Sequence, residues 1–161
     1  MGSQRVPTSA GLTLMELVIA IAVLSLLASV AMPLAEVTVT RTKEIELRRA
    51  LREIRGAIDA YKDDYDRAVN EKKIIDVVGK SGYPEDLAVL VNGTEWGGLY
   101  PYKKKYLRRL PRDPFDRNNI GWGLRSYADA PDSQIWGGKN VYDIYSQHHG
   151  TALDGSFYRD W

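Results

Sequence analysis

The segment Ser9–Glu36, SAGLTLMELVIAIAVLSLLASVAMPLAE, decides how this chain is organised. From Leu17 to Ala35 it contains nineteen consecutive uncharged and mostly apolar residues. A helix needs about 20 such residues to cross ~30 Å of hydrocarbon. The remaining chain is too small and too polar to bury this helix on all sides, and a cleaved signal peptide has a shorter apolar stretch. We therefore predict a membrane-spanning helix rather than a core helix or a secretory signal.

The residues after this apolar run predict that the same helix continues. Apolar side chains recur there at steps of four and three residues, at Leu47, Leu51, Ile54, Ile58, Tyr61 and Tyr65. Charged residues, Arg55 among them, occupy the other faces, so this part is an amphipathic helix with one face against a partner. Pro33 is expected to kink the helix without ending it. The prediction is one helix over roughly Leu14–Val69.

Beyond about Asn70 the sequence changes to short segments interrupted by Gly, Pro, Asn and Asp, which is typical of loops and strands. Pro84 and Gly93 bracket a short helix, expected over 85–91. Strands are expected where apolar and polar residues alternate, over 123–128, 141–146 and 156–161. Such a small antiparallel sheet needs a partner, and the apolar stripe of the helix provides one. The expected fold class is α+β.

Composition narrows the functional classes. The chain has 22 basic and 21 acidic residues and a net charge of +1, so no overall field attracts nucleic acid. It has no cysteine, which excludes disulfides, thiolate metal sites and cysteine nucleophiles. There is no Gly-x-Ser-x-Gly motif, no phosphate-binding loop and no histidine beside an evident nucleophile. An enzyme is therefore not expected.

Two local groups in the second half have more than one interpretation. His148 and His149 favour an exposed loop pair over a transition-metal site, because no third ligand is evident. A basic cluster favours a solvated face or an ion-pair surface between subunits over a nucleic-acid contact. It comprises Lys103, Lys104, Lys105, Arg108, Arg109 and Arg112. Pro111 and Pro114 predict a rigid extended segment, and Phe115, Trp122 and Tyr127 are expected to pack in the core or on the sheet.

Glu16 lies one residue before the apolar run. A carboxylate there is either interfacial, favoured by the positive end of the helix dipole, or paired with an opposite charge. If the chain were cut after Gly11, Glu16 would become the fifth residue of the product. The new ammonium group at Leu12 would then reach the Glu16 carboxylate of a neighbouring copy.

This arrangement resembles the class III leader of type IV pilins and pseudopilins. In that family a polar leader ends in Gly, cleavage precedes a hydrophobic residue that becomes N-methylated, and a Thr-Leu-x-Glu segment opens an apolar helix. Gly11, Leu12 and Glu16 match in place, as does the proline at Pro33. The first mature residue is Leu where Phe is usual, and the leader has one basic residue, Arg5.

The second half resembles the major pseudopilins of type II secretion systems. The segments GYPEDLAVL, YLRRLPRDPFDRNNIGWGLRSY and YDIYS carry this resemblance, including Leu110, Pro111, Asp113, Pro114 and Phe115. The resemblance implies a type IV pilin-like fold with three parts: a cleaved leader, residues 1–11; a transmembrane and assembly segment, residues 12–35; and a periplasmic head, residues 36–161.

The function implied by this resemblance is structural. A prepilin peptidase would cut after Gly11 and methylate Leu12, leaving a single-pass protein in the bacterial inner membrane with its head in the periplasm. Copies would join each other and minor pseudopilins, on an inner-membrane assembly platform, in a filament that drives protein export. The positive-inside count, with Arg41, Lys43, Arg48 and Arg49 after the run, favours the opposite orientation, and we give the leader motif precedence.

Two other functions stay open at this point. One is a type IV pilin subunit of a motility, adhesion or DNA-uptake filament. The other is a membrane-tethered metal- or ligand-binding domain that uses His148, His149 and the acidic last loop.

Major pseudopilins also bind calcium in their last loop through aspartates and backbone carbonyls. Here Asp154-Gly155 resembles part of that pattern, displaced along the chain. The resemblance implies Asp154 and Asp160 as possible calcium ligands, with Asp143 nearby. The alternative is that Phe157, Tyr158 and Trp161 hold the loop by packing.

Overall fold

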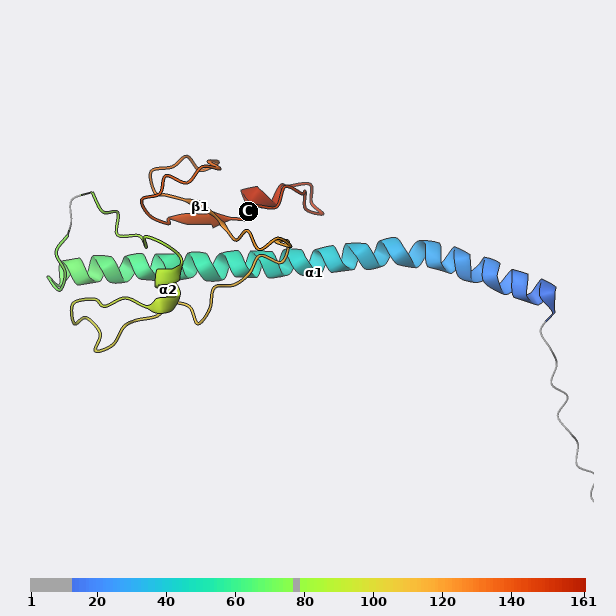
Figure 1. The fold of residues 1–161 in the computed structure, drawn as a ribbon, viewed down its shortest axis with the longest axis horizontal. Coiled ribbons are helices and arrows are strands. Elements are labelled where there is room, and N and C mark those ends of the chain that lie inside the picture. Colours follow the sequence, from blue (N-terminus) through green and yellow to red (C-terminus); the bar gives the residue numbers. More distant parts are fainter. Residues whose placement is uncertain (1–12, 77–78) are drawn as a thin grey trace, which may run out of the picture. The chain divides into compact units, whose positions relative to one another are not determined.

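The computed structural model describes residues 13–76 and 79–161, without the side chains of residues 30–33. A long helix α1 (Leu14–Asn70) is followed by a short helix α2 (Ala88–Asn92), strands β1 (Gly123–Arg125) and β2 (Asp143–Tyr145), and a 3₁₀ turn η1 (Tyr158–Asp160) (Figure 1). This confirms the predicted single helix and the α+β class. The chain divides into two compact units, one ending at Val39 and the other covering Thr40–Trp161, and each is described by itself.

Two predicted features of the first unit, the cleavage site and the helix kink, lie outside the described residues and side chains. Gly11 and Leu12 lie before the described residues, so the cleavage site is a prediction from sequence alone. Helix α1 includes position 33, but the side chain of Pro33 is not described, and the kink there also stays a prediction.

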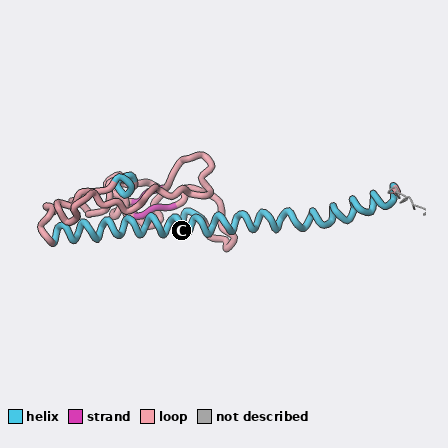
Figure 2. The backbone as a smooth tube through the Cα atoms, turned by 90° about the horizontal axis from the view of Figure 1, so that it is seen from below, coloured by secondary structure: helices cyan, strands magenta, loops and turns pink. Residues whose placement is uncertain are grey.

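In the second unit, the predicted apolar stripe of α1 forms the core. Leu47, Leu51, Ile54 and Ile58 are at most 2% exposed, and Tyr61 packs against them half-buried. Residues from every later part of the chain complete the same core: Leu87, Leu90, Leu107, Trp122, Val141, Ile144, Ala152 and Tyr158. Figure 2 shows the loops and both strands lying along this part of the helix. The prediction that the stripe is covered by the sheet and loops is thus confirmed.

The two strands pair in antiparallel fashion, with Leu124 opposite Ile144, and are shorter than predicted. The first strand ends at Arg125 because a turn follows at once. In this turn the Asp129 carboxylate accepts a hydrogen bond from the Ser126 N–H at 2.7 Å. An aspartate that bonds a backbone N–H three residues earlier closes a turn and withdraws that N–H from the sheet.

The third predicted strand, over 156–161, is wrong. Phe157 forms one isolated bridge with Thr151, and the chain then bends into η1. The Asp160 N–H donates to the Phe157 carbonyl at 3.0 Å, and the Trp161 N–H donates to the Tyr158 carbonyl at 3.3 Å. These local bonds use the backbone groups that a strand would have given to a neighbour.

The short helix begins at Ala88 instead of residue 85. The Asp86 carboxylate accepts a hydrogen bond from the Val89 N–H at 2.9 Å, so the preceding residues form a turn that is closed by this side chain. The helix ends at Asn92, one residue later than expected, and Gly93 terminates it as predicted, with φ at +86° where a side chain would be strained.

Candidate assembly site and the contacts that hold the head

Glu16 lies in the first turn of α1, and its side chain is exposed. The Glu16 N–H donates a hydrogen bond to Thr13 Oγ1 at 3.2 Å, so Thr13 caps the helix. Thr-x-x-Glu is the sequence of a capping box, in which the glutamate also bonds back to the capping residue. That second bond is absent among the described residues, so the carboxylate stands at the positive end of the helix dipole with its acceptor oxygens available.

The large apolar side chains that the structure describes after Glu16 in the first unit are exposed, from Leu17 at 51% to Val39 at 57%. Within the described residues, α1 is the one helix long and apolar enough to cross a membrane. Its hydroxyl groups bond back to the helix: Ser25 Oγ donates to the Ile21 carbonyl at 2.8 Å and Ser29 Oγ to the Leu26 carbonyl at 2.9 Å. Polar groups satisfied in this way are compatible with a hydrocarbon environment.

Three polar residues of α1 hold the head, and we call Glu44, Arg55 and Asp64 the helix anchors. Buried Glu44 accepts hydrogen bonds from the Leu153 N–H at 2.8 Å and from the Tyr158 hydroxyl at 3.0 Å. Burial, together with this bond to Glu44, raises the pKa of Tyr158 to about 12. Tyr158 therefore stays protonated and keeps donating its hydrogen bond at physiological pH.

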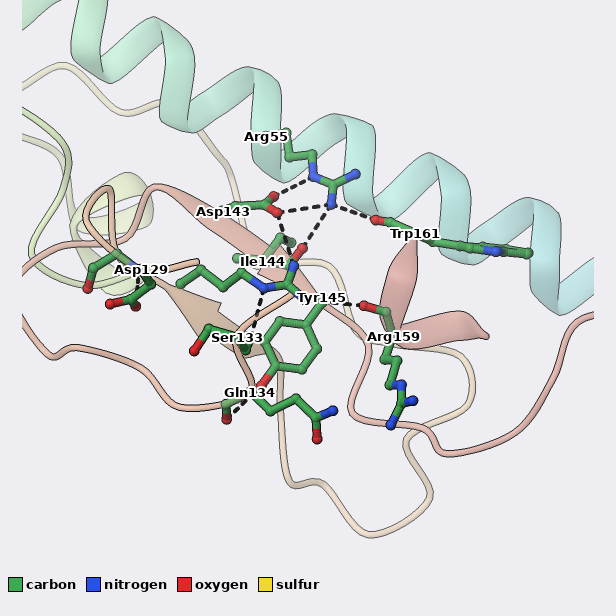
Figure 3. Close-up of polar contacts among 11 residues, drawn as sticks. Arg55, Asp129, Ser133, Gln134, Asp143, Ile144, Tyr145, Arg159 and Trp161 are labelled. Atoms are coloured by element: carbon green, nitrogen blue, oxygen red, sulfur yellow. Dashed lines mark hydrogen bonds and ion pairs between the residues drawn. The ribbon is translucent and has the colours of Figure 1, made fainter. Parts of the chain in front are cut away.

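Arg55 joins α1 to β2 and to the last residue of the chain (Figure 3). Its Nε donates to Asp143 Oδ1 at 2.7 Å, and its Nη2 donates to the Ile144 carbonyl at 3.0 Å and to the Trp161 carbonyl at 2.6 Å. Arg125 of β1 approaches the other Asp143 oxygen at 3.3 Å. One carboxylate thus lies between two guanidinium groups, and one guanidinium satisfies two backbone carbonyls.

Buried Asp64 holds the segment after α2. It accepts hydrogen bonds from the Tyr100 hydroxyl at 2.8 Å, from the Tyr106 hydroxyl at 2.6 Å and from Lys104 Nζ at 2.6 Å. Burial raises the pKa of the Asp64 carboxyl, but the combined hydrogen bonds from Lys104 and the two tyrosines outweigh it and leave the pKa below its ordinary value. Asp64 is therefore ionised at neutral pH despite its burial.

The sequence pattern contained a signal for two of these anchors. Glu44 lies three residues before Leu47, and Asp64 lies three residues after Tyr61, so both carboxylates are in phase with the apolar stripe. A charged residue on the buried face of a helix requires a partner, because an unpaired buried charge is costly. Arg55 also lies three residues before Ile58, but it belongs to the charges that the sequence pattern assigns to solvent-facing positions, so its partners were not predicted.

The proline-bracketed segment holds a further buried carboxylate that the sequence did not reveal. Asp113 accepts hydrogen bonds from the Phe115 N–H at 2.8 Å and from the buried Ser146 hydroxyl at 2.5 Å. Trp122 is buried, and its Nε1 donates to the Pro111 carbonyl at 2.9 Å. These bonds give the segment its fixed place beside the core.

The three aromatic residues predicted to pack have different environments. Phe115 packs half-buried against the core and Trp122 is buried, as predicted. Tyr127 is 62% exposed, so it belongs to the surface rather than the core. Its ring lies against Tyr83 and Tyr142, with centroids 5.7 and 5.3 Å away, because the turn after β1 carries it out of the sheet.

The predicted calcium ligands each have an arginine close by. Asp154 pairs with Arg48 at 3.1 Å, Asp143 lies between Arg55 and Arg125, and exposed Asp160 lies 3.7 Å from Arg159. Nowhere in residues 13–76 and 79–161 do three His, Asp or Glu side chains gather as a metal site. This donor set does not fit a calcium cage, because the carboxylates do not gather with a third ligand in the described part of the chain and each lies beside a guanidinium group. Calcium remains a prediction from the resemblance.

The residues expected to hold the last loop by packing do so in part. Tyr158 is buried and its ring packs on Trp161 at 5.1 Å, whereas Phe157 is largely exposed. Both histidines are exposed, and the His148 ring also stacks on Phe115, with ring centroids 5.2 Å apart. This agrees with the interpretation of His148 and His149 as a pair in an exposed loop.

The basic cluster does not act as one surface. Lys104 turns inward to Asp64, and Arg112 donates to Asn119 Oδ1 at 2.6 Å. Lys103 lies 3.8 Å from Glu95. The exposed side chains of Arg108 and Arg109 make no hydrogen bond or ion pair with any residue that the structure describes.

No protein-family model, no curated protein and no solved structure matches this chain. The fold is therefore described by its class, α+β, with one long N-terminal helix and a two-stranded antiparallel sheet. A functional proposal rests on the motifs of the sequence and on the geometry above.

Proposed function

We propose that this chain is a structural subunit of the type IV pilin-like family, closest to the major pseudopilin of a type II secretion system. The observation that carries the proposal is helix α1, whose first part is apolar and exposed and whose second part is the core of a folded head. A subunit that assembles through its membrane helix needs both properties in one helix. The proposal includes the pilin-like fold, which the coarse α+β arrangement supports.

Glu16 has the central role in this proposal. An unpaired charged side chain costs about 2.5–3.5 kcal/mol at the centre of a membrane helix, so a carboxylate at the start of an apolar helix favours a partner of opposite charge. Cleavage after Gly11 would create such a partner at Leu12. When the ammonium of one copy meets the Glu16 carboxylate of its neighbour, both charges are neutralised, and each added copy brings the same pair.

The surroundings of the subunit follow from the resemblance. A prepilin peptidase would process it, and the mature protein would be a single-pass protein of the bacterial inner membrane with its head in the periplasm. Minor pseudopilins and an assembly platform would be its partners, and neither nucleic acid nor an enzymatic substrate is proposed. Contacts between different surfaces of identical copies generate open helical filaments, which is the assembly that we propose.

The decisive experiment is the mass of the amino-terminal peptide of the protein purified from its native membrane. We expect a peptide that begins at Leu12 and carries one additional methyl group. The Gly11→Ser variant is the matched comparison, and we expect it to remain in the membrane at its full, unprocessed length. An unmethylated amino terminus upstream of Gly11 in the native protein would refute the proposal.

Orientation is tested separately, because the positive charges after the apolar run argue against it. We expect a reporter that is active only in the periplasm to be active when fused after Trp161. An inactive reporter, with the same fusion present in the membrane, would place the head in the cytoplasm and contradict the proposal.

A further inference from the structure

A groove of about 520 Å³ lies beside α1 in the second unit. Its floor is made of small residues on one face of the helix, Gly56, Ala57 and Ala60, and one wall is formed by residues 106–109. A Cβ atom added at Gly56 would meet nothing within 4 Å, so this floor is open. A shallow floor of small residues admits a protruding side chain from another molecule.

The rim of this groove is positively charged. Arg108 and Arg109 line it and are exposed without a partner among the described residues, whereas Glu53 contributes a single carboxylate. Two guanidinium groups against one carboxylate leave a net positive rim. An occupant of complementary charge is therefore acidic and carries an apolar side chain for the floor.

The loop between β1 and β2 has this combination. The part from Tyr127 to Gly138 contains two charged residues, Asp129 and Asp132, both acidic, and the loop's one basic residue, Lys139, follows it. Ile135 in the same loop is 82% exposed. The exposed segment 71–76 also presents an aliphatic residue, Ile75, but its two acidic and two basic residues cancel.

This loop is held in a defined shape. The Asp129 carboxylate accepts hydrogen bonds from the Ser126 N–H at 2.7 Å and from the Gly137 N–H at 3.0 Å, which joins the two ends of the loop. The same backbone bonds lower the pKa of Asp129, which is therefore ionised at neutral pH. In its middle, the Ser133 and Gln134 carbonyls accept hydrogen bonds from Arg125 at 2.9 Å and Tyr145 at 3.1 Å (Figure 3). A preorganised loop loses little freedom on binding.

We propose that this loop of one copy docks in the groove of a second copy, with Ile135 on the small-residue floor and Asp132 facing Arg108 and Arg109. The groove wall belongs to the segment after α2 and the docking loop to the segment after β1; Figure 1 draws these two segments on either side of the α1 axis, and Figure 2 shows both along one side of the helix. Because the loop and the groove are formed by different segments, one copy offers them to two different neighbours. Such a head-to-tail contact repeats without closing unless the rotation between copies forms a ring.

This inference rests on the proposed filament and adds the contact between its heads. Because the chain has no cysteine, pairs of introduced cysteines report proximity without background. Two differently tagged full-length copies are co-expressed, one carrying Gly56→Cys and the other Ile135→Cys, and their membranes are oxidised. A disulfide needs Cβ atoms within about 3.5–4.5 Å, and a mixed-tag product can arise only between copies.

The control pairs Gly56→Cys with Ile75→Cys, a position of similar exposure. We expect a mixed-tag disulfide from the Ile135 pair and little from the Ile75 pair. Adding Arg109→Glu to the Gly56→Cys copy should abolish the product, and adding Asp132→Arg to the other copy should restore it. Equal yields from both pairs, or no product from the Ile135 pair, would overturn the inference.

Filaments are measured in the same membranes by sedimentation and electron microscopy. Filaments without the Ile135 product would overturn the docking contact and leave the proposed function standing. The Ile135 product without filaments would support the docking contact and count against the proposed function. The two proposals thus fail in different ways.

Discussion

Replacing Asp64 with Asn tests whether the buried carboxylate of α1 holds the head. Asp64 accepts three charge-assisted hydrogen bonds, from Lys104, Tyr100 and Tyr106, each of which contributes about 1.5–3 kcal/mol. The amide of Asn keeps one acceptor oxygen, and Lys104 retains its bond to the Tyr100 hydroxyl at 3.0 Å. We therefore expect a net loss of about 3 kcal/mol in the free energy of unfolding, near the lower end of the cost of breaking a buried ion pair.

The assay is the thermal unfolding of the full chain in detergent, followed by tryptophan fluorescence. All four tryptophans lie after residue 90, so the signal reports the head and not the apolar part of α1. For a domain of this size, 3 kcal/mol lowers the Tm by about 9–15 °C. The neighbouring variant Asp63→Asn, at an exposed position, is the matched control and should change stability by about 0.5 kcal/mol or less.

The difference between wild type and Asp64→Asn should also depend on pH. Because the folded protein lowers the pKa of Asp64, the carboxylate stabilises the fold fully above its unfolded pKa of about 4. This stabilisation is lost as the pH falls through the lower folded pKa. The two proteins should therefore converge in stability below about pH 4. A difference of less than about 0.5 kcal/mol at pH 7, or one that does not shrink in acid, would refute the role of Asp64.

Three further predictions concern Arg55, Glu16 and the acidic last loop. Arg55→Met removes the hydrogen-bond donor of two backbone carbonyls and one partner of Asp143. It should lower the free energy of urea unfolding by about 2 kcal/mol, because Arg125 still pairs with Asp143. The control Arg52→Met, at an exposed position, should leave this free energy almost unchanged. Glu16→Gln keeps the size of the side chain but not its charge, so it and Glu16→Ala should insert yet sediment as unassembled protein; normal filaments from Glu16→Gln would contradict charge pairing. Calcium up to millimolar concentration should leave the Tm unchanged, because arginines hold the acidic groups of the last loop, whereas a saturable rise would establish calcium binding.

The long helix was predictable because its evidence lies within one element. A repeat at steps of three and four residues records which face of a helix is buried, and Leu47, Leu51, Ile54 and Ile58 are buried as that repeat requires. The strands were harder to predict, because their ends depend on side chains outside them. Asp129 ends the first strand through a bond to Ser126 that no alternation of apolar residues records.

The contacts of Arg55 could not be predicted from local pattern. The pattern of an amphipathic helix indicates that a charged residue on its polar face is exposed to solvent. Whether that residue has partners depends on which distant segments of the chain pack against it. Asp143, Ile144 and Trp161 come back to Arg55 from positions 88, 89 and 106 residues later in the chain. The Glu16 proposal differs again, because its partner would be created by processing and would belong to another copy.

Because the anchors on α1 and their partners lie far apart in the sequence, the partners are synthesised well after the helix. Glu44 bonds to Tyr158, 114 residues later, and Arg55 bonds to Trp161, 106 residues later. At a synthesis rate of about 5–20 residues per second, roughly 6–23 s pass between the appearance of Glu44 and that of its partner. During this interval the apolar stripe of α1 lacks its final cover. A nascent chain therefore passes through a period in which its long apolar helix is complete while its head is still open to proteolysis and to wrong association.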